Sequence, residues 1–183
     1  MRRLLCLLFL SVCSLQAADY PVVIRLSAEA DAKEGDTFTV PVEVPGLPKK
    51  IFVRKVPIIS ERDIVAFYPF SAGDGTIGAY FKLDHDGTAK LEQHTTEARD
   101  RVVVASINGR AAAAMQVDKK ILDGMLMIPQ GFRPLEIAQL QTKYPTIGKE
   151  KEFSEQKKTA QKALKDADRA RKAQEKAEKA QGN

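Results

Sequence analysis

The stretch from Gly78 to Tyr144 constrains the fold more than any other part of this 183-residue chain. Asn108-Gly109 is typical of a two-residue hairpin turn, because both residues tolerate positive φ. Pro134 suits the first turn of a helix, where its missing N–H is not needed. The apolar runs between these signals predict strands over 79–83, 102–107, 110–117 and 125–128, and helices over 84–99 and 134–142. This order is typical of an α+β domain.

The residues before this stretch predict further strands over 22–26, 37–44 and 51–56. Pro41 places the second of them at a sheet edge. Ser60, followed three positions later by Asp63, has the pattern of a helix N-cap. The sequence therefore predicts a short helix that ends near Phe67, because Pro69 disfavours helical geometry in the residue before it. The expected fold is α+β, with a mixed or antiparallel sheet, two main helices packed on it and a long charged C-terminal helix.

The first 17 residues predict a secretory signal peptide. A positive start at Arg2 and Arg3 precedes about twelve apolar residues, too few to span a bilayer of roughly 30 Å, and Ala17 offers a small residue for cleavage. The protein is therefore expected to be periplasmic or secreted. Cys6 and Cys13 both lie in this segment, so the mature chain would have no disulfide and no thiolate. The alternatives are an uncleaved membrane anchor or a lipid anchor at Cys13.

The charge of the chain is uneven. Residues 149–183 carry eleven Lys or Arg against seven Asp or Glu, whereas residues 18–148 carry 16 positive and 17 negative side chains. A near-neutral body argues against a nucleic-acid-binding protein. The Lys, Glu, Gln and Ala of the tail favour a helix. That helix is either solvated and partly frayed or an arm that binds a partner or contacts a polyanion. Its seam offers only Phe153, Leu164 and alanines, so a stable coiled coil is not expected.

Two short motifs are better explained by turns and caps than by ligands. Gly73–Gly78 matches G-x-G-x-x-G, but a strand follows it, whereas a dinucleotide site needs a helix there. Asp84–Gly87 resembles the start of a calcium loop, yet the twelfth position is Thr95, where a glutamate is required. We expect a turn at the first motif and a helix cap at the second.

No residue is predicted to be catalytic, cofactor-binding or metal-ligating, and no cofactor is expected. His85 and His94 are the only histidines, and nine helical residues place them on opposite faces, so they cannot share a metal ion. No serine lies in a G-x-S-x-G elbow. A hydrolase would require a pocket in which one of these histidines meets a serine and a carboxylate. The apolar residues of 111–115 and 125–128 are expected in the core, although an exposed edge strand that pairs with a peptide is the alternative.

Residues 56–146 resemble the head of the first periplasmic domain of SecD, a subunit of the bacterial preprotein translocase. Phe81–Gly87 matches the strand-to-helix pattern F-x-L-D-x-x-G of that family. Met115 stands where the family usually has a proline. The remaining matches are Ile58–Ile64, Thr95 or Thr96, Val102–Arg110, Ile121, Gly124, Ile128, Gly131-Phe132, Glu136 and Leu140.

The resemblance implies an α+β head of a type that contacts extended polypeptides outside the membrane. The resemblance does not imply proton-driven protein export, because no membrane helix is predicted after residue 17. The expected division is a signal peptide over 1–17, an N-terminal β segment over 18–55, the head over 56–146 and the charged tail over 149–183. We interpret the chain as a non-catalytic exported binding module of the cell envelope, with a protein or peptide partner, no nucleic acid and no membrane span in the mature chain. The alternative is a structural adaptor that docks through its basic tail on a complex or an anionic surface; the oligomeric state is left open.

Overall fold

The computed structural model describes the backbone of residues 21–181 and the side chains of residues 21–173. The predicted signal peptide and both cysteines lie outside the described residues. The fold is α+β, as the sequence predicts. Its elements are β1 (Ile24–Ala28), a 3-10 turn (Ala32–Glu34), β2 (Thr39–Val42), β3 (Ile51–Arg54), β4 (Ile59–Ser60), β5 (Ile64–Ser71), β6 (Ile77–Leu83), α1 (His85–Glu97), β7 (Val102–Ile107), β8 (Arg110–Gln116), β9 (Met125–Phe132), α2 (Pro134–Lys143) and α3 (Glu150–Gln181).

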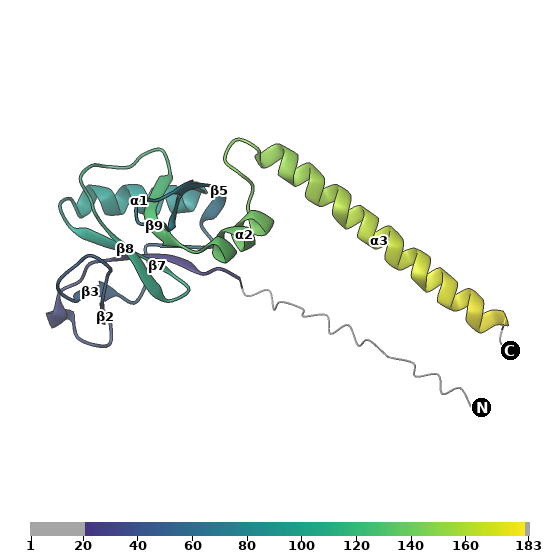
Figure 1. Ribbon diagram of the computed structural model, residues 1–183, viewed down its shortest axis with the longest axis horizontal. Helices are drawn as coiled ribbons and strands as arrows, with labels where there is room; N and C mark the ends of the chain where they lie inside the picture. Colours follow the sequence, from purple (N-terminus) through teal and green to yellow (C-terminus); the bar gives the residue numbers. More distant parts are fainter. Residues whose placement is uncertain (1–20, 182–183) are drawn as a thin grey trace, which may run out of the picture.

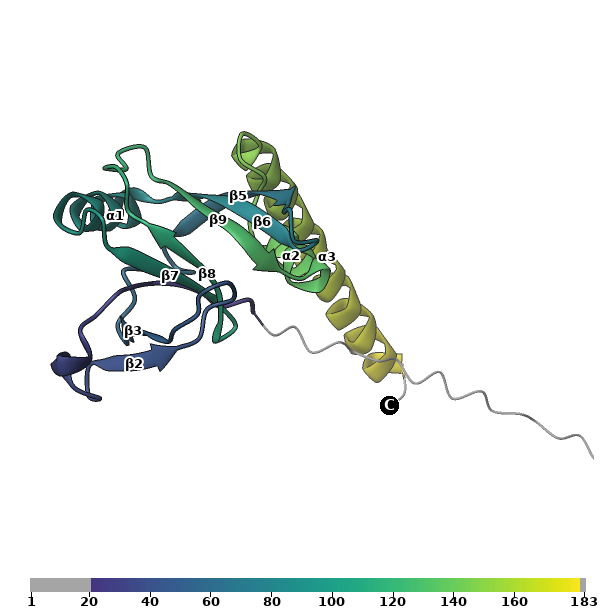
Figure 2. The same ribbon diagram turned by 60° about the vertical axis from the view of Figure 1, so that its left-hand side comes forward.

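Within residues 21–181 the strands form three antiparallel sheets, whose strands can be followed in Figures 1 and 2. The largest has the order β4-β1-β7-β8, the second has the order β5-β6-β9, and β2 pairs with β3 alone. Strand β1 comes from the N-terminal segment but lies in the middle of the first sheet, between β4 and β7. The segments 18–55 and 56–146 therefore share one sheet and one core.

The main core lies between the four-stranded sheet, the three-stranded sheet and the first two helices. Phe67, Phe81 and Phe132 are its largest fully buried side chains. The centroid of the Phe81 ring lies 6.1 Å from that of Phe67 and 5.7 Å from that of Phe132. Leu91 of α1 and Leu140 of α2 close the core. Burial of these side chains gives the body its main stabilisation.

The β2–β3 hairpin covers the other face of β7 and β8, on the side away from α1 in both views (Figures 1 and 2). Val44 and Val53 pack there against Val104. Strand β7 is therefore covered on both faces, which explains why five of its six residues, Val102–Ile107, are apolar.

Local signals predicted most boundaries correctly. The Asp84 side chain caps α1 by accepting a hydrogen bond from Gly87 N at 2.7 Å, and Pro134 is the first residue of α2. Asn108 and Gly109 adopt φ of 50° and 77° in the β7–β8 turn. Strand β9 extends beyond its predicted end at Ile128, to Phe132.

The helix predicted over residues 60–67 is wrong. Ser60 N does donate to Asp63 Oδ2 at 2.8 Å, and Asp63 N donates to Ser60 O at 3.1 Å, but they close one turn between β4 and β5. The aromatic and branched residues that follow, Ile64–Ser71, form a strand instead, with Pro69 inside it. Capping hydrogen bonds stabilise an isolated turn as well as the start of a helix. Pairing of β5 with β6 determines that a strand follows the turn here.

Helix α3 leaves the body as a single rod (Figure 1). The segment before it is tied to β5, because Phe67 N donates to Pro145 O at 3.0 Å and Ile147 N donates to Phe67 O at 3.1 Å. In the first turn of α3, Lys82 Nζ lies 3.0 Å from Glu150 Oε1, and this hydrogen bond lowers the pKa of Glu150. Within residues 21–181, no helix is both long enough and apolar enough to cross a membrane.

Candidate functional site

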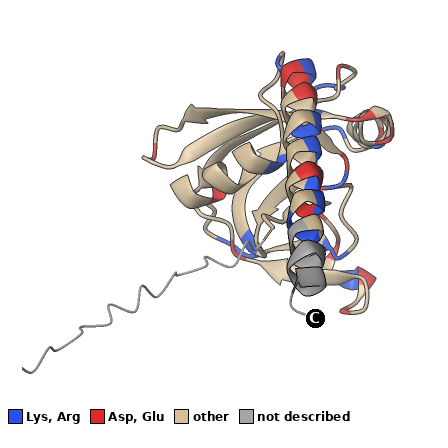
Figure 3. Cartoon of the chain, turned by 90° about the vertical axis from the view of Figure 1, so that its right-hand side faces the viewer, with Lys and Arg blue, Asp and Glu red and all other residues tan. Residues whose placement is uncertain are grey.

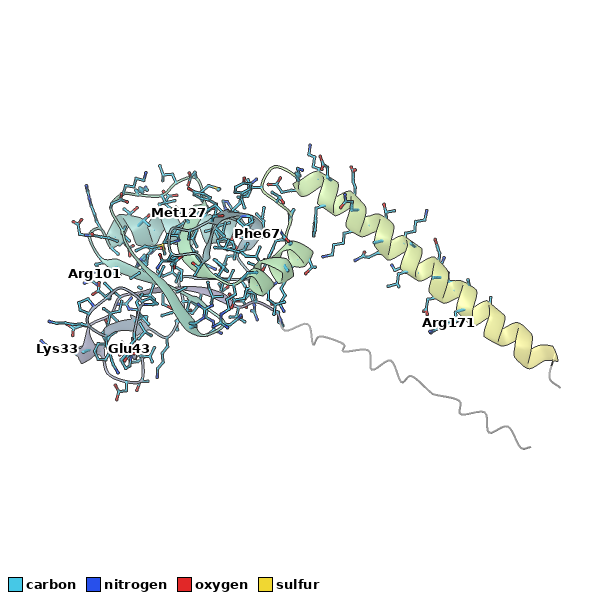
Figure 4. The ribbon with its side chains drawn as sticks, in the orientation of Figure 1. Lys33, Glu43, Phe67, Arg101, Met127 and Arg171 are labelled. Atoms are coloured by element: carbon cyan, nitrogen blue, oxygen red, sulfur yellow. The ribbon has the colours of Figure 1, made fainter. Side chains whose placement is uncertain are left out.

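A row of partly exposed apolar side chains crosses the three-stranded sheet. Tyr68 of β5 lies opposite Tyr80 of β6, and Tyr80 lies opposite Met127 of β9. Side chains alternate along a strand, so these three point away from the core while their neighbours Phe67 and Phe81 point into it. The exposed fractions are 52% for Tyr68, 40% for Tyr80 and 43% for Met127. We call these three residues the apolar row; Figure 4 labels Met127 and Phe67.

Phe70 extends the apolar row toward the β5–β6 turn. Its ring lies 5.1 Å from the Tyr80 ring, tilted by 44°. Phe70 pairs with Gly78, and a Cβ on Gly78 would come within 2.5 Å of the Phe70 ring and 2.4 Å of Pro129 O. The last glycine of the G-x-G-x-x-G motif is therefore needed for strand packing. The start of the motif forms a turn, as predicted, with Gly75 at φ 80°.

A cleft of about 650 Å³ adjoins the apolar row. Tyr80 and Met127 line it on one side, and the loop that connects β8 to β9 lines the other with Ile121 and Leu122. Its apolar walls include Leu91 of α1. Volumes of about 300–1,000 Å³ are typical of ligand sites, so this cleft is large enough to take side chains of a partner.

The loop that forms the cleft is fixed to α1. Ile121 N donates to Thr95 Oγ1 at 3.1 Å, and Lys120 Nζ lies 2.9 Å from Glu92 Oε1. Gly124 ends the loop at φ 65°, and a Cβ there would lie 2.3 Å from Thr88 Oγ1. These contacts indicate a cleft that exists before a partner binds.

The cleft has no unsatisfied buried polar group with which to orient a small polar ligand. Thr95 is the buried polar side chain in its wall, and its hydroxyl donates to Leu91 O at 2.8 Å while accepting from Ile121 N. Among the described side chains, two buried polar atoms lack a hydrogen-bond partner, Glu61 Oε2 and His94 Nε2, and neither residue lines the cleft. The chemistry of the cleft therefore favours apolar groups.

The β5 edge of the three-stranded sheet is poorly suited to pairing with a further strand. Phe67 already directs its N–H and C=O outward to the segment 145–147. Pro69, two residues on, faces the same way and has no N–H. Strand β5 therefore offers little of the hydrogen-bonding ladder that an added strand requires.

The β2 edge has the same protection. Phe52 O accepts from Ala30 N at 2.9 Å, so the backbone of Phe52 faces away from β2. Its partner Pro41 consequently faces the open edge, where its missing N–H removes a pairing site. The prediction of an edge position for Pro41 is confirmed.

Asp63 fixes the start of α1 against the β4–β5 turn. Its side chain lies 2.7 Å from Lys90 Nζ and accepts hydrogen bonds from Ser60, and Gly87 packs so closely that a Cβ there would lie 2.8 Å from Asp63 Cβ. Burial alone would raise the pKa of Asp63, but the hydrogen bonds from Lys90 and Ser60 outweigh it and hold the pKa below 3.8. These contacts position the helix that supplies one wall of the cleft.

The structure does not bring the histidines into a shared site. His85 is exposed at the start of α1, whereas His94 is half-buried between α1 and the β3 end. Burial lowers the pKa of His94, and the nearby Arg54 lowers it further. Among the described residues, no group of three or more His, Cys, Asp or Glu is placed to hold a metal ion.

One shallow cleft does contain Ser60, Asp63 and His94. However, Ser60 Oγ donates to Asp63 Oδ2 at 3.0 Å, and His94 Nε2 makes no hydrogen bond to either residue. A nucleophilic triad requires the histidine between the serine and the carboxylate. This arrangement does not form one.

The sequence did not predict the apolar row. The sequence predicts a helix over 60–67, so the alternation of exposed and buried side chains in β5 is not expected there. It also predicts that all of residues 125–128 lie in the core. In the structure Leu126 and Ile128 are buried, whereas Met127 is exposed. The alternation of Tyr80 and Lys82 with buried neighbours was the available signal, but the row depends on register between three separate strands.

Comparison with known proteins gives few matches. No family model and no curated protein matches the sequence. A crystal structure of SecDF in its super-membrane-facing form aligns with 68% of this chain and 19% of that chain, with a TM-score of 0.48 and 14% identity. A structure of SecDF, described as a membrane component that enhances protein export, aligns with 66% of this chain and 60% of that chain, with a TM-score of 0.47 and 12% identity. The chain spans less than two thirds of the length of either structure.

Proposed function

We propose that this protein is a non-catalytic binding module that holds an extended apolar segment of another polypeptide. The segment lies across the apolar row and places side chains in the adjoining cleft. The observation that supports this function is the alignment of Tyr68, Tyr80 and Met127 on three neighbouring strands, next to an apolar cleft of about 650 Å³.

The residue types suit a polypeptide partner. Tyrosine and methionine are enriched in protein interfaces, and the flexible methionine side chain adapts to partners of different shape. Strands lie about 4.8 Å apart, so the row extends for about 10 Å. The cleft and Phe70 lengthen this surface, which suits a chain segment better than a compact small molecule.

The partner binds to the face of the sheet and not to its edge. Pro69 and Pro41 remove donors from the β5 and β2 edges, as described above, so strand addition at these two edges has little support. The exposed face keeps its side chains available while the backbone groups of β6 are paired on both sides. Binding is therefore driven by burial of apolar side chains.

We further propose that the protein is exported and acts in the cell envelope, with residues 1–17 as its signal peptide. Residues 56–146 would correspond to the head of the first periplasmic domain of SecD. The F-x-L-D-x-x-G motif supports this, because Asp84 caps α1 and Gly87 packs against Asp63. Residues 18–55 supply β1 and the β2–β3 hairpin to the same body, and residues 149–183 form the tail.

Peptide affinity tests this function. A fluorescent, extended peptide with alternating apolar residues is titrated into the chain, and binding is followed by anisotropy. Replacing all three residues of the apolar row with serine should weaken binding by about 100-fold or more, because truncating an interface anchor costs over about 1 kcal/mol. The matched control replaces three exposed apolar residues elsewhere, Phe38, Val56 and Leu135, with serine.

Equal affinities of the two triple variants would overturn the proposal. Deletion of residues 149–183 separates this function from that of an adaptor that docks through its tail. The module retains peptide affinity after this deletion, whereas the adaptor loses its association.

A further inference from the structure

Helix α3 carries a continuous stripe of positive charge on one face. At 100° per residue, six cations fall within an arc of about 80°, and no acidic residue of 150–173 falls within it. We call them the basic stripe: Lys151, Lys158, Lys162, Lys165, Arg169 and Lys172. Figure 3 shows Lys and Arg recurring along the whole described length of the helix.

The cations of the basic stripe are exposed and mostly unneutralised. All six are exposed to solvent. Lys172 Nζ lies 3.3 Å from Asp168 Oδ2, and the other five make no ion pair among the described side chains. At 1.5 Å per residue the stripe spans about 30 Å. This is a linear array of accessible charge.

The rest of α3 offers little apolar surface. Leu164 is 74% exposed, Phe153 is half-buried near the body, and the other apolar residues of 150–173 are alanines. Beyond its first turns α3 extends away from the body, and Arg171 lies far from the body along it (Figure 4). Any partner of this face is therefore bound through charge and not through burial of apolar area.

We infer that the basic stripe lies along an anionic lipid bilayer surface and holds the body next to it. Protein interfaces are depleted of lysine at their centres and rely on aromatic and arginine anchors, whereas five of these six cations are lysines. Lysine is a mobile point charge that suits a diffuse layer of headgroups, and polybasic segments are attracted to anionic leaflets. This inference does not depend on peptide binding in the cleft, because the two surfaces share no residue.

The orientation follows from how α3 is joined to the body. The ladder between Phe67 and residues 145–147, together with the Lys82–Glu150 pair, fixes the first turn of α3 next to β5. A bilayer along the stripe would therefore hold the three-stranded sheet close to the membrane surface. The apolar row would then meet polypeptides near that surface.

Vesicle co-sedimentation of the full chain tests this inference. The vesicles are phosphatidylcholine alone or phosphatidylcholine with about one third phosphatidylglycerol. We expect binding to the anionic vesicles to exceed binding to neutral ones by about 100-fold or more at about 50 mM salt, and to be largely lost at about 500 mM salt. Replacing Lys158, Lys162 and Lys165 with glutamine should reduce anionic binding by about 100-fold, at about 1 kcal/mol for each lysine.

The control variant removes the same charge outside the stripe, at Lys33, Lys49 and Lys157. All three are exposed, and glutamine preserves helix propensity at position 157. The control should bind within about twofold of the unaltered chain. Circular dichroism confirms that both variants keep α3.

Three outcomes would overturn the inference. They are equal binding to neutral and anionic vesicles, equal binding by the two triple variants, or stripe-dependent binding to polyglutamate with none to anionic vesicles. The last outcome would assign the stripe to an acidic protein partner. None of these results bears on peptide affinity at the apolar row.

Discussion

The body over residues 21–148 and the helix α3 are held together by different forces. The body buries three phenylalanines and most of its aliphatic side chains, whereas α3 from residue 154 to 173 has no buried side chain. The body therefore depends on packing, and α3 depends on helix propensity and local ion pairs. The contrast extends to function: the body presents a shaped apolar surface and α3 presents charge.

The largest effect should come from the centre of the body. Replacing Phe81 with alanine should cost about 3–5 kcal/mol of unfolding free energy, because its fully buried ring contacts Phe67 and Phe132. Urea unfolding followed by tyrosine fluorescence measures the loss. Leu164→Ala on α3 should change the unfolding free energy of the body by less than about 0.5 kcal/mol. Equal losses would show that α3 belongs to the same cooperative unit.

A second large effect should come from Glu136, the buried carboxylate that joins α2 to the β7–β8 turn. Arg110 approaches both of its oxygens at 3.2 Å, and Asn108 Nδ2 and Arg133 N donate to it at 3.0 and 2.8 Å. Glu136→Ala should cost about 3 kcal/mol in thermal or urea unfolding, since it leaves these donors unsatisfied. Glu155→Ala on exposed α3 is the control and should be near neutral. A loss below about 1 kcal/mol for the Glu136 variant would contradict this role.

A smaller effect is expected where the cleft loop ends. Gly124→Ala should cost about 1–3 kcal/mol, because the residue has positive φ and the new methyl group meets Thr88. Gly73→Ala is the control, since Gly73 has ordinary φ and open space around it. The peptide affinity of the Gly124 variant is measured as well, because Gly124 ends the loop that lines the cleft. Unchanged stability and unchanged affinity would mean that the loop is not fixed as described.

The smallest effect should be a pH dependence that comes from His94 of the body. The pKa of His94 is lowered by burial and by Arg54, so the unfolded chain binds this proton more readily than the folded chain. Stability is therefore full above pH 6.5 and declines as the pH falls from 6.5 through the lowered pKa. His94→Gln should remove this decline, and His85→Gln should leave it intact. Asp63 adds a separate loss as the pH falls below 3.8.

The sequence predicts those helix and turn boundaries that depend on the preferences of neighbouring residues. Asp84, Asn108-Gly109 and Pro134 each mark a boundary through the preference of one or two residues, and each boundary is confirmed. The long C-terminal helix was equally predictable, because it makes few tertiary contacts that could override its propensity.

Pairing between distant segments was not predictable from the same signals. Ser60 and Asp63 make capping hydrogen bonds, but pairing of β5 with β6 turns the following residues into a strand. The apolar row was missed for the same reason, because it requires Tyr68, Tyr80 and Met127 to fall in register. Leu126 is buried and Met127 is exposed because adjacent residues of a strand face opposite sides of the sheet. The pairing of β9 with β6 decides which of the two faces the core.

Site-specific photocrosslinking tests the central claim most directly. A photoreactive amino acid replaces Met127 in the full chain. In a second sample it replaces Phe38, which is also exposed but lies in the turn just before β2. Each sample is irradiated with an extended apolar peptide. The account predicts adducts from position 127 and few from position 38. Equal labelling of both positions, or no adduct from position 127 while the peptide is bound, would contradict it.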